Sequence, residues 1–546
     1  MNTPRPKWGT TSLPIFCALA LLLLPTYALL DACSRTSQAS PSPNILLRGL
    51  GPEPDSLDPQ RATTVEAQTV LRDLCEGLLT LDKQAGPAPG VAETFEVSPE
   101  RTTYRFHLRQ DARWSNGDRV VAADFVAGFR RLADPATGSR YQTFVSMILH
   151  APAIFVGKEP VERLGVSAID EHTMVIQLAA PVPYFTQLLA HPSTCPIHRS
   201  SLAQHGNQFT RAGTMVSNGA FQLKEWRVGS DLLLTTNANY WNRSATRLDG
   251  VEYIFTPNAN DELTRYRAGG LHITSGVSRA QYDWVRSTLG GELHLSPQLG
   301  TYFYGFNLDR RPFKDSLKLR RALSLAIDRE RLIGAILRAG EIPAYGWIPP
   351  QVNGYAAPSL DYRHEADSER LAEARRLYAE AGYSVSKPVH FELRYNNGET
   401  HTKLAIAIAG MWRETLGLDV TLRAEEFASL LQDIDRGNLE MFRASWIADY
   451  NDAYSFAQFF ETGSGVNLTH YRNPIYDALL AQSQIETDPT KRQRLLEKAE
   501  RLVLEDQPLI PIYFFVNKHL VKREVGGWYD NALNVVYSKH LWLSVH

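Results

Sequence analysis

Residues 369–382 read ERLAEARRLYAEAG, and residues 389–398 read VHFELRYNNG. In the first segment apolar residues recur every three or four positions, which predicts a helix ending at its last glycine. In the second they alternate with polar residues, which predicts a strand and a turn. The pair repeats at 404–417 (LAIAIAGMWRETLG) and 418–422 (LDVTL). A helix before each strand favours an α/β lobe.

Tyr104, Phe106 and Leu108 alternate with polar residues before a Ser-Asn-Gly turn at 115–117, which predicts another half-buried strand.

Length and charge narrow the class of protein further. The chain has 546 residues, more than one core normally serves, so at least two lobes are expected. Its 57 Lys and Arg nearly balance 59 Asp and Glu, which disfavours a nucleic-acid partner.

The four cysteines are Cys17, Cys33, Cys75 and Cys195. None forms a CxxC pair or stands near histidines at zinc-site spacing, so no metal site is expected. If targeting accounts for the first two, Cys75 and Cys195 remain available for a disulfide. The sequence leaves open whether that bond forms, because it does not give the geometry.

The N-terminus has the layout of a secretory signal. Arg5 and Lys7 precede an almost entirely apolar run over 13–30, and LDAC at 30–33 resembles a bacterial lipobox. We therefore expect a signal peptide over 1–33, lipidation at Cys33 and a Ser/Pro-rich tether over 34–44. The charged Asp31 departs from the lipobox pattern, and an uncleaved membrane helix is the alternative.

Several segments, in order along nearly all of the mature chain, resemble one protein family. They are EPDSLDP (53–59), CEGL (75–78), 89–129, SNGAFQLKEW (217–226), NYWN (239–242), PFKD (312–315), ALSLAID (322–328) and PAYG (343–346). The chain is thus similar to the oligopeptide-binding proteins of ABC transporters, the family 5 extracellular solute-binding proteins.

This resemblance implies an α/β, two-lobed periplasmic-binding-protein fold of class II, cluster C, with an additional subdomain. The ligand would lie in the cleft between the lobes, and two crossing strands would join them. The implied ranges are 45–76, 203–299 and 516–546 for lobe I, 77–202 for the additional subdomain (lobe II) and 300–515 for lobe III.

The segment RASWIADYND at 443–452 is similar to the family's ligand-binding loop. The resemblance implies that Asp449 pairs with the α-ammonium group of a bound peptide, while Arg443 and His401 receive its carboxylate. The intervening residues would pair with the extended peptide backbone, as in strand addition. They are Ala444, Ser445, Trp446, Ile447 and Ala448.

Four more residues are expected to line the cleft: Tyr141, Thr63, Val65 and Phe303. Tyr141 resembles a family tyrosine that faces the ligand, and Phe303 replaces another. Thr63 stands where close relatives carry an acidic residue in the first side-chain pocket. Pocket preference is therefore expected to differ, with a more apolar wall near Phe303.

Other classes of function have less support. A calcium loop starting at Asp449 would need glycine at its sixth position, which is Tyr454. The sequence has no Walker A, GxSxG, HExxH or catalytic CxxC motif, so neither catalysis nor a cofactor is expected. We expect a monomeric, periplasmic lipoprotein that captures peptides of two to five residues for an inner-membrane ABC permease and ATPase. Receptors for murein or signalling peptides are the alternative, and nickel complexes or haem are weaker ones.

Overall fold

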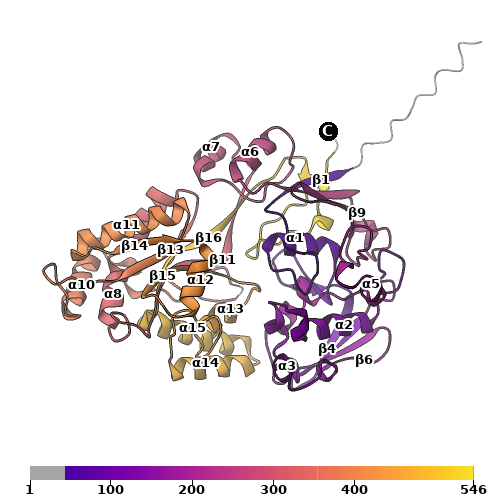
Figure 1. The fold of residues 1–546 in the computed structure, drawn as a ribbon, viewed down its shortest axis with the longest axis horizontal. Helices are drawn as coiled ribbons and strands as arrows, with labels where there is room; N and C mark the ends of the chain where they lie inside the picture. Colours follow the sequence, from indigo (N-terminus) through magenta and orange to yellow (C-terminus); the bar gives the residue numbers. More distant parts are fainter. Residues whose placement is uncertain (1–43, 353, 545–546) are drawn as a thin grey trace, which may run out of the picture. The chain divides into compact units, whose positions relative to one another are not determined.

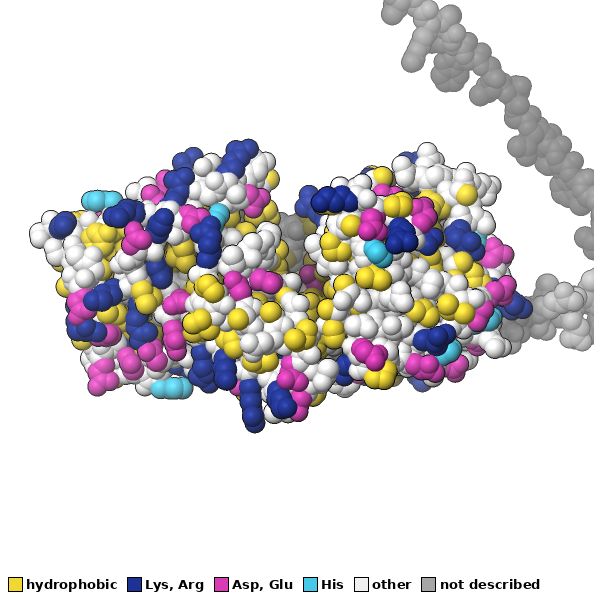
Figure 2. Space-filling model, turned by 90° about the horizontal axis from the view of Figure 1, so that it is seen from below, with side chains coloured by type: hydrophobic (Ala, Val, Ile, Leu, Met, Phe, Trp, Pro, Cys, Tyr) yellow, Lys and Arg dark blue, Asp and Glu magenta, His cyan; other side chains and the backbone are white. Residues whose placement is uncertain are grey.

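The computed structural model describes residues 44–352 and 354–544. The predicted signal peptide, Cys33 and nearly all of the tether lie outside these residues. Three mixed layers of sheet and helix confirm the α/β prediction. Over the described ranges, no helix is both long and apolar enough to cross a membrane. On the face seen in Figure 2, acidic and basic side chains are interspersed, in keeping with the balanced charge.

One four-stranded sheet falls in the ranges predicted for lobe I, in the order β1-β10-β9-β8. The strand β1 runs parallel to β10, while β9 is antiparallel to both of its neighbours. The apolar face of α1 packs against this sheet in one core cluster. The elements are β1 (Ile45–Gly51), α1 (Val65–Leu74), β8 (Phe221–Arg227), β9 (Asp231–Thr236) and β10 (Gly250–Phe255).

A second four-stranded sheet lies within 77–202, in the order β4-β5-β7-β6, and every neighbouring pair is antiparallel. It packs against α2 through alternate apolar residues such as Tyr104 and Phe106. The elements are β4 (Ala92–Val97), β5 (Thr103–Leu108), α2 (Ala122–Ala133), β6 (Val166–Ala168) and β7 (Thr173–Gln177). The strand predicted around Tyr104 is confirmed as β5.

The third sheet has six strands in the order β12-β16-β11-β15-β13-β14. Its two longest strands, β11 and β16, pair antiparallel from Leu293↔Leu520 to Gly305↔Leu509, and Figure 1 shows them side by side. At one end Leu520 donates to Thr274 of the lobe I range, so these strands run from the range predicted for lobe I into the range predicted for lobe III. The strands are β11 (Leu293–Phe306), β12 (Ile342–Pro343), β13 (Glu392–Asn396), β14 (Thr421–Glu425), β15 (Met441–Ile447) and β16 (Leu509–Leu520).

Helices cover both faces of this sheet. Alternation along β11 sends Tyr302 and Tyr304 into one core cluster with α8, α10 and α11, and Phe303 into another with α12, α14 and α15. Figure 1 shows α11 on one side and α14 with α15 on the other. These helices are α8 (Leu317–Leu325), α10 (Asp367–Glu380), α11 (Glu399–Leu416), α12 (Phe427–Asp435), α14 (Pro474–Ile485) and α15 (Pro489–Asp506).

The helix-strand pairs predicted over 369–398 and 404–422 are confirmed as α10-β13 and α11-β14, but both strands start later than predicted. The strand β13 begins at Glu392, where its ladder with β14 starts, and the amide of Val389 lies outside this ladder and donates to the hydroxyl of Tyr378. Leu418 is buried in the core below α11 before the ladder of β14 begins. Because the apolar alternation includes these buried residues, each predicted strand began before the first hydrogen-bonded pair of the observed strand.

The remaining elements are short and connect these layers. They are β2 (Leu79–Leu81), β3 (Pro87–Pro89), α3 (Ala151–Phe155), α4 (Phe185–Leu188), α5 (Arg199–His205), α6 (Ala259–Arg267), α7 (Tyr282–Thr288), α9 (Arg329–Leu332), α13 (Tyr454–Ala457), β17 (Val525–Gly526) and β18 (Trp542–Leu543).

Candidate functional site

The central feature of the candidate site is the second half of β15. On one side β15 pairs with β11 along its whole length, from Phe306↔Met441 to Gly300↔Ile447. On the other side β13 pairs with β15 only at Met441 and Phe442. In the described structure no other strand pairs with that side from Arg443 onward. An extended chain could therefore add to this backbone edge.

Asp449 follows this edge by two residues. Its side chain is exposed, and no hydrogen-bond or ion-pair partner of its carboxylate is found among residues 44–352 and 354–544. Desolvation by surrounding protein raises the pKa of Asp449 to about 6, while the charge of Arg72 opposes the rise. The side chain still reaches solvent. Nearby protein atoms, which replace part of the surrounding water without covering the carboxylate, therefore cause this desolvation.

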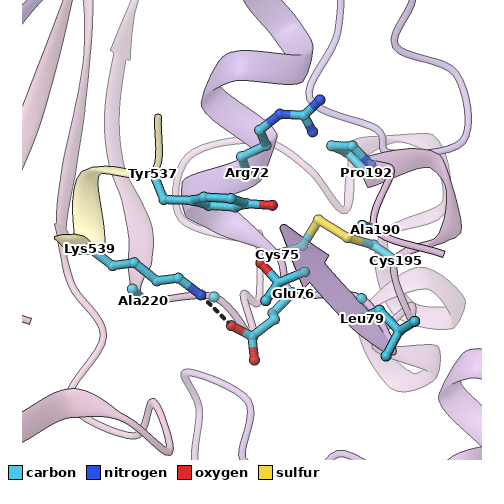
Figure 3. A pocket seen from close by; sticks show the side chains of 13 residues that line it. Arg72, Cys75, Glu76, Leu79, Ala190, Pro192, Cys195, Ala220, Tyr537 and Lys539 are labelled. Atoms are coloured by element: carbon cyan, nitrogen blue, oxygen red, sulfur yellow. Dashed lines mark hydrogen bonds and ion pairs between the residues drawn. A yellow bond between two sulfur atoms is a disulfide. The ribbon is translucent and has the colours of Figure 1, made fainter. Parts of the chain in front are cut away.

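Arg72, on α1 in the lobe I range, supplies the opposing charge. Figure 3 shows its side chain above the ring of Tyr537 in a pocket that also contains the Cys75–Cys195 disulfide. In the same pocket, Glu76 pairs with Lys539 at 2.7 Å. Nη1 of Arg72, by contrast, is buried and has no hydrogen-bond partner in the described part of the chain.

The disulfide answers the question that the sequence left open. It joins the residue after α1 to the segment that follows His191, whose ring lies 4.5 Å from the ring of Tyr141. It therefore ties together the segments that carry Arg72 and support Tyr141. Burial, followed by the charge of Asp449, raises the pKa of Tyr141 to about 12.

Thr63 and Val65 lie at the start of α1. The amide and hydroxyl of Thr63 donate to Asp55 at 2.8 and 2.6 Å. Burial disfavours the charge of Asp55, but hydrogen bonds from Thr63 and Thr64 outweigh it and lower its pKa. A carboxylate thus lies beside Thr63, although position 63 itself is not acidic. Val65 is 73% exposed and free to meet a ligand.

Arg443 and His401 meet at the ring of Tyr302. The guanidinium of Arg443 lies 4.5 Å from the ring centroid and donates to Asn396 at 3.0 Å. Nδ1 of His401 lies 3.1 Å from the Tyr302 hydroxyl. Gly398 precedes α11 with φ 151°, and a Cβ there would come within 3.0 Å of the His401 ring. The glycine therefore allows His401 to reach this position.

The ionisation of His401 follows from these neighbours. Burial, then the positive charges of Arg443 and Arg279, lowers its pKa to about 4. His401 is therefore neutral near pH 7 and can offer a single N–H rather than a charge.

The residues between Arg443 and Asp449 are partly buried in the core. Trp446 donates from its indole nitrogen to the carbonyl of Ser455 at 2.8 Å, and its ring packs against Phe459. Ala444 and Ala448 are buried, Ser445 is half-buried and Ile447 is 48% exposed. The prediction for Phe303 needs correction, because its ring is fully buried against Trp347 and Phe459 and supports β11 from within the core.

The calcium alternative finds no support here. Both carboxylate oxygens of Asp452 accept from Arg492, at 2.7 and 2.8 Å. Arg72 and Asp55 were not among the predicted site residues. Both lie within or near the family-like segments 53–59 and 75–78, but only the folded chain brings them to Asp449 and Tyr141.

Comparisons with known proteins agree with this geometry. Residues 86–467 match the family model of bacterial extracellular solute-binding proteins, family 5 (middle). The periplasmic oligopeptide-binding protein OppA of Salmonella typhimurium is 37% identical, over 92% of this chain and 93% of its own. A probable deoxycholate-binding periplasmic protein, YgiS of Escherichia coli, is 38% identical over 90% and 92% of the two chains.

A solved structure is similar to this protein in fold. The unliganded open form of the Escherichia coli murein tripeptide-binding protein MppA superposes with a TM-score of 0.81 at 34% identity, covering 92% of this chain and 98% of its own. This similarity confirms the two-lobed fold expected from the resemblance. The chain belongs to family 5 of the bacterial extracellular solute-binding proteins.

Proposed function

We propose that this protein is the substrate-binding component of an ABC importer and captures short peptides. One observation carries the proposal: opposite charges stand at the two ends of the unpaired edge of β15. Asp449 can receive an ammonium group, and Arg443 with His401 can receive a carboxylate. An extended peptide has these groups at its ends and backbone hydrogen-bonding groups between them.

The spacing of the charges supports a short ligand. Five residues lie between Arg443 and Asp449, so an extended backbone of six residue steps would span at most roughly 20 Å between them. A peptide of about five residues has a similar extended length, at about 3.3–3.6 Å per residue. Shorter peptides would reach His401 or Arg443 according to their length. Backbone pairing ignores side chains, so weak sequence preference is expected.

Capture rather than chemistry is the proposed role. The groups around Asp449 come from different lobe ranges, since the charge of Arg72 opposes the rise in the pKa of Asp449 and the charge of Asp449 raises the pKa of Tyr141. A ligand that contacts both lobes favours the closed state and shifts the population toward it. The closed complex would then deliver its peptide to an inner-membrane permease, with ATP hydrolysed by other subunits.

Relatives define the alternatives to be tested. MppA is a murein tripeptide-binding protein, so a cell-wall peptide with a free amino group is the second candidate. The similarity to YgiS adds deoxycholate, which has one carboxylate and no ammonium group. The exposed carboxylate of Asp449 favours a ligand that carries an ammonium group.

Native mass spectrometry of the purified protein, followed by calorimetry, tests the proposal. We expect retained or added peptides of two to five residues, and tri-alanine binding that N-acetylation weakens strongly. Deoxycholate binding without peptide binding would overturn the proposal. Selective binding of murein tripeptide over tri-alanine would replace it with the second candidate.

We also propose that the protein acts in the periplasm as a lipoprotein anchored through Cys33. Replacing Cys33 by Ser should abolish lipid labelling and release the protein from membranes. Cys17→Ser provides the matched control, because it removes a cysteine from the same segment and should leave labelling intact. Membrane attachment that persists in Cys33→Ser would favour an uncleaved helix instead.

A further inference from the structure

A second group of cations lies beside the carboxylate-binding end of β15. Arg279, in the lobe I range, pairs through Nη2 with Oε1 of Glu341 at 2.8 Å. Lys518 on β16 pairs with the same oxygen at 3.0 Å. The side chain of Glu341 is only 1% exposed, whereas that of Arg279 is 31% exposed. Arg279 therefore lies at the boundary between the buried ion pairs and solvent.

This group is continuous with the one around Tyr302. Glu341 directly precedes β12, whose Pro343 pairs with Tyr513 on β16. The ring of Tyr513 stacks on that of Tyr302 at 4.7 Å, and Tyr302 contacts both Arg443 and His401. The positive charge of Arg279 also contributes to the low pKa of His401. The two groups thus form one cationic patch.

The charges and hydrogen bonds of the patch are not balanced. Arg279, Lys518 and Arg443 bring three positive charges, and Glu341 brings one negative charge. Nη1 of Arg279 and Nε of Arg443 are buried donors without a hydrogen-bond partner within the described residues, against one such buried acceptor, Oε2 of Glu341. An unpaired buried donor is costly, so the patch would be stabilised by more than one anionic group.

We infer that the patch around Arg279 is a subsite for a second anionic group at the carboxyl end of the ligand. This inference rests on the proposed function and names the preferred substrate: peptides whose last residue is acidic. Such a residue carries its α-carboxylate and a side-chain carboxylate a few bonds apart. Arg443 and His401 would receive the first, and Arg279 would receive the second as a fork-shaped donor.

Calorimetry with three tripeptides tests the subsite: Ala-Ala-Glu, Ala-Ala-Gln and Ala-Ala-Ala. The wild type should bind the Glu peptide about tenfold or more tightly than its isosteric Gln counterpart. Arg279→Gln should abolish this preference while leaving the affinities for the other two peptides nearly unchanged. Arg279→Lys keeps the positive charge but loses the two parallel N–H donors of the guanidinium, so it should retain part of the preference for the Glu peptide.

Arg338→Gln is the matched control. Arg338 also forms an ion pair between the lobe III and lobe I ranges, with Asp283 at 2.7 Å, but both side chains are about 60% exposed. This variant should keep the full preference for the Glu peptide. Equal binding of the Glu and Gln peptides by the wild type would overturn the subsite alone. Failure of all three peptides to bind would overturn the proposed function itself.

Discussion

The two ends of the open edge of β15 are built differently. At one end the Asp449 carboxylate is exposed and lacks a partner among the described residues, with a pKa raised to about 6. At the other, Arg443 is 8% exposed and lies on Tyr302, with His401 and the Arg279 group nearby. A single carboxylate therefore serves the proposed ammonium position, whereas the guanidinium of Arg443 and the neutral ring of His401 share the proposed carboxylate position, with further cations nearby.

This difference predicts unequal tolerance to change. Loss of the single carboxylate at Asp449 would leave the ammonium group of the ligand without an opposite charge. Loss of one cation at the other end would leave neighbouring cations near the carboxylate of the ligand. The arrangement suits a receptor for peptides of several lengths. The ammonium position stays constant, and the carboxylate can fall at different places along a cationic patch.

The largest expected effect is at the ammonium end. Asp449→Asn should weaken tri-alanine binding by at least two orders of magnitude, because closure of the lobes around the peptide would bury the charge pair, and breaking a buried pair typically costs about 3–5 kcal/mol. Calorimetry should compare both proteins with tri-alanine and its N-acetyl form. Acetylation should matter much less in the variant, since the partner of that charge is already lost. Additive losses would make Asp449 a structural loop residue.

A smaller effect is expected at the other end. Arg443→Gln should weaken binding by between about tenfold and a hundredfold, the range for one hydrogen bond to a charged group. Adding His401→Ala should weaken it further. Peptides with an amidated C-terminus should be insensitive to both changes. A loss in Arg443→Gln equal to that in Asp449→Asn would contradict the proposed sharing of the carboxylate.

Acidic pH should also act through Asp449. A ligand ammonium group favours the ionised carboxylate, so protonation below about pH 6 competes with binding. Affinity should fall about tenfold between pH 7 and pH 5, since each pH unit below the pKa costs up to a factor of ten. His401, with its pKa of about 4, stays neutral in this window. Asp449→Asn should bind independently of pH there.

The smallest expected effect concerns Tyr302. Tyr302→Phe removes the hydroxyl next to His401 but keeps the ring beneath Arg443, so tri-alanine affinity should fall by about threefold or less. Tyr302→Leu also removes the ring and should weaken binding more. Equal losses in the two variants would mean that the hydroxyl, not the ring, positions the cations.

Two helices and three strands of the fold followed from local sequence patterns. Helical spacing before Gly382 and Gly417 predicted α10 and α11, because side-chain period and helix caps are properties of adjacent residues. The same patterns misjudged the starts of β13 and β14, since Val389 and Leu418 are apolar core residues outside the ladder. Periodicity reports burial, whereas a strand also requires a neighbouring strand to pair with.

For the site, the resemblance of 443–452 to the family's ligand-binding loop singled out Arg443 and Asp449, which lie at the two ends of the open backbone edge of β15. Only the tertiary structure joined Cys75 to Cys195, brought Arg72 toward Asp449 and placed Arg279 beside the Tyr302 group. It also turned Phe303 into the core. These relations link residues far apart in the chain, and their proximity depends on how whole layers pack rather than on any local pattern.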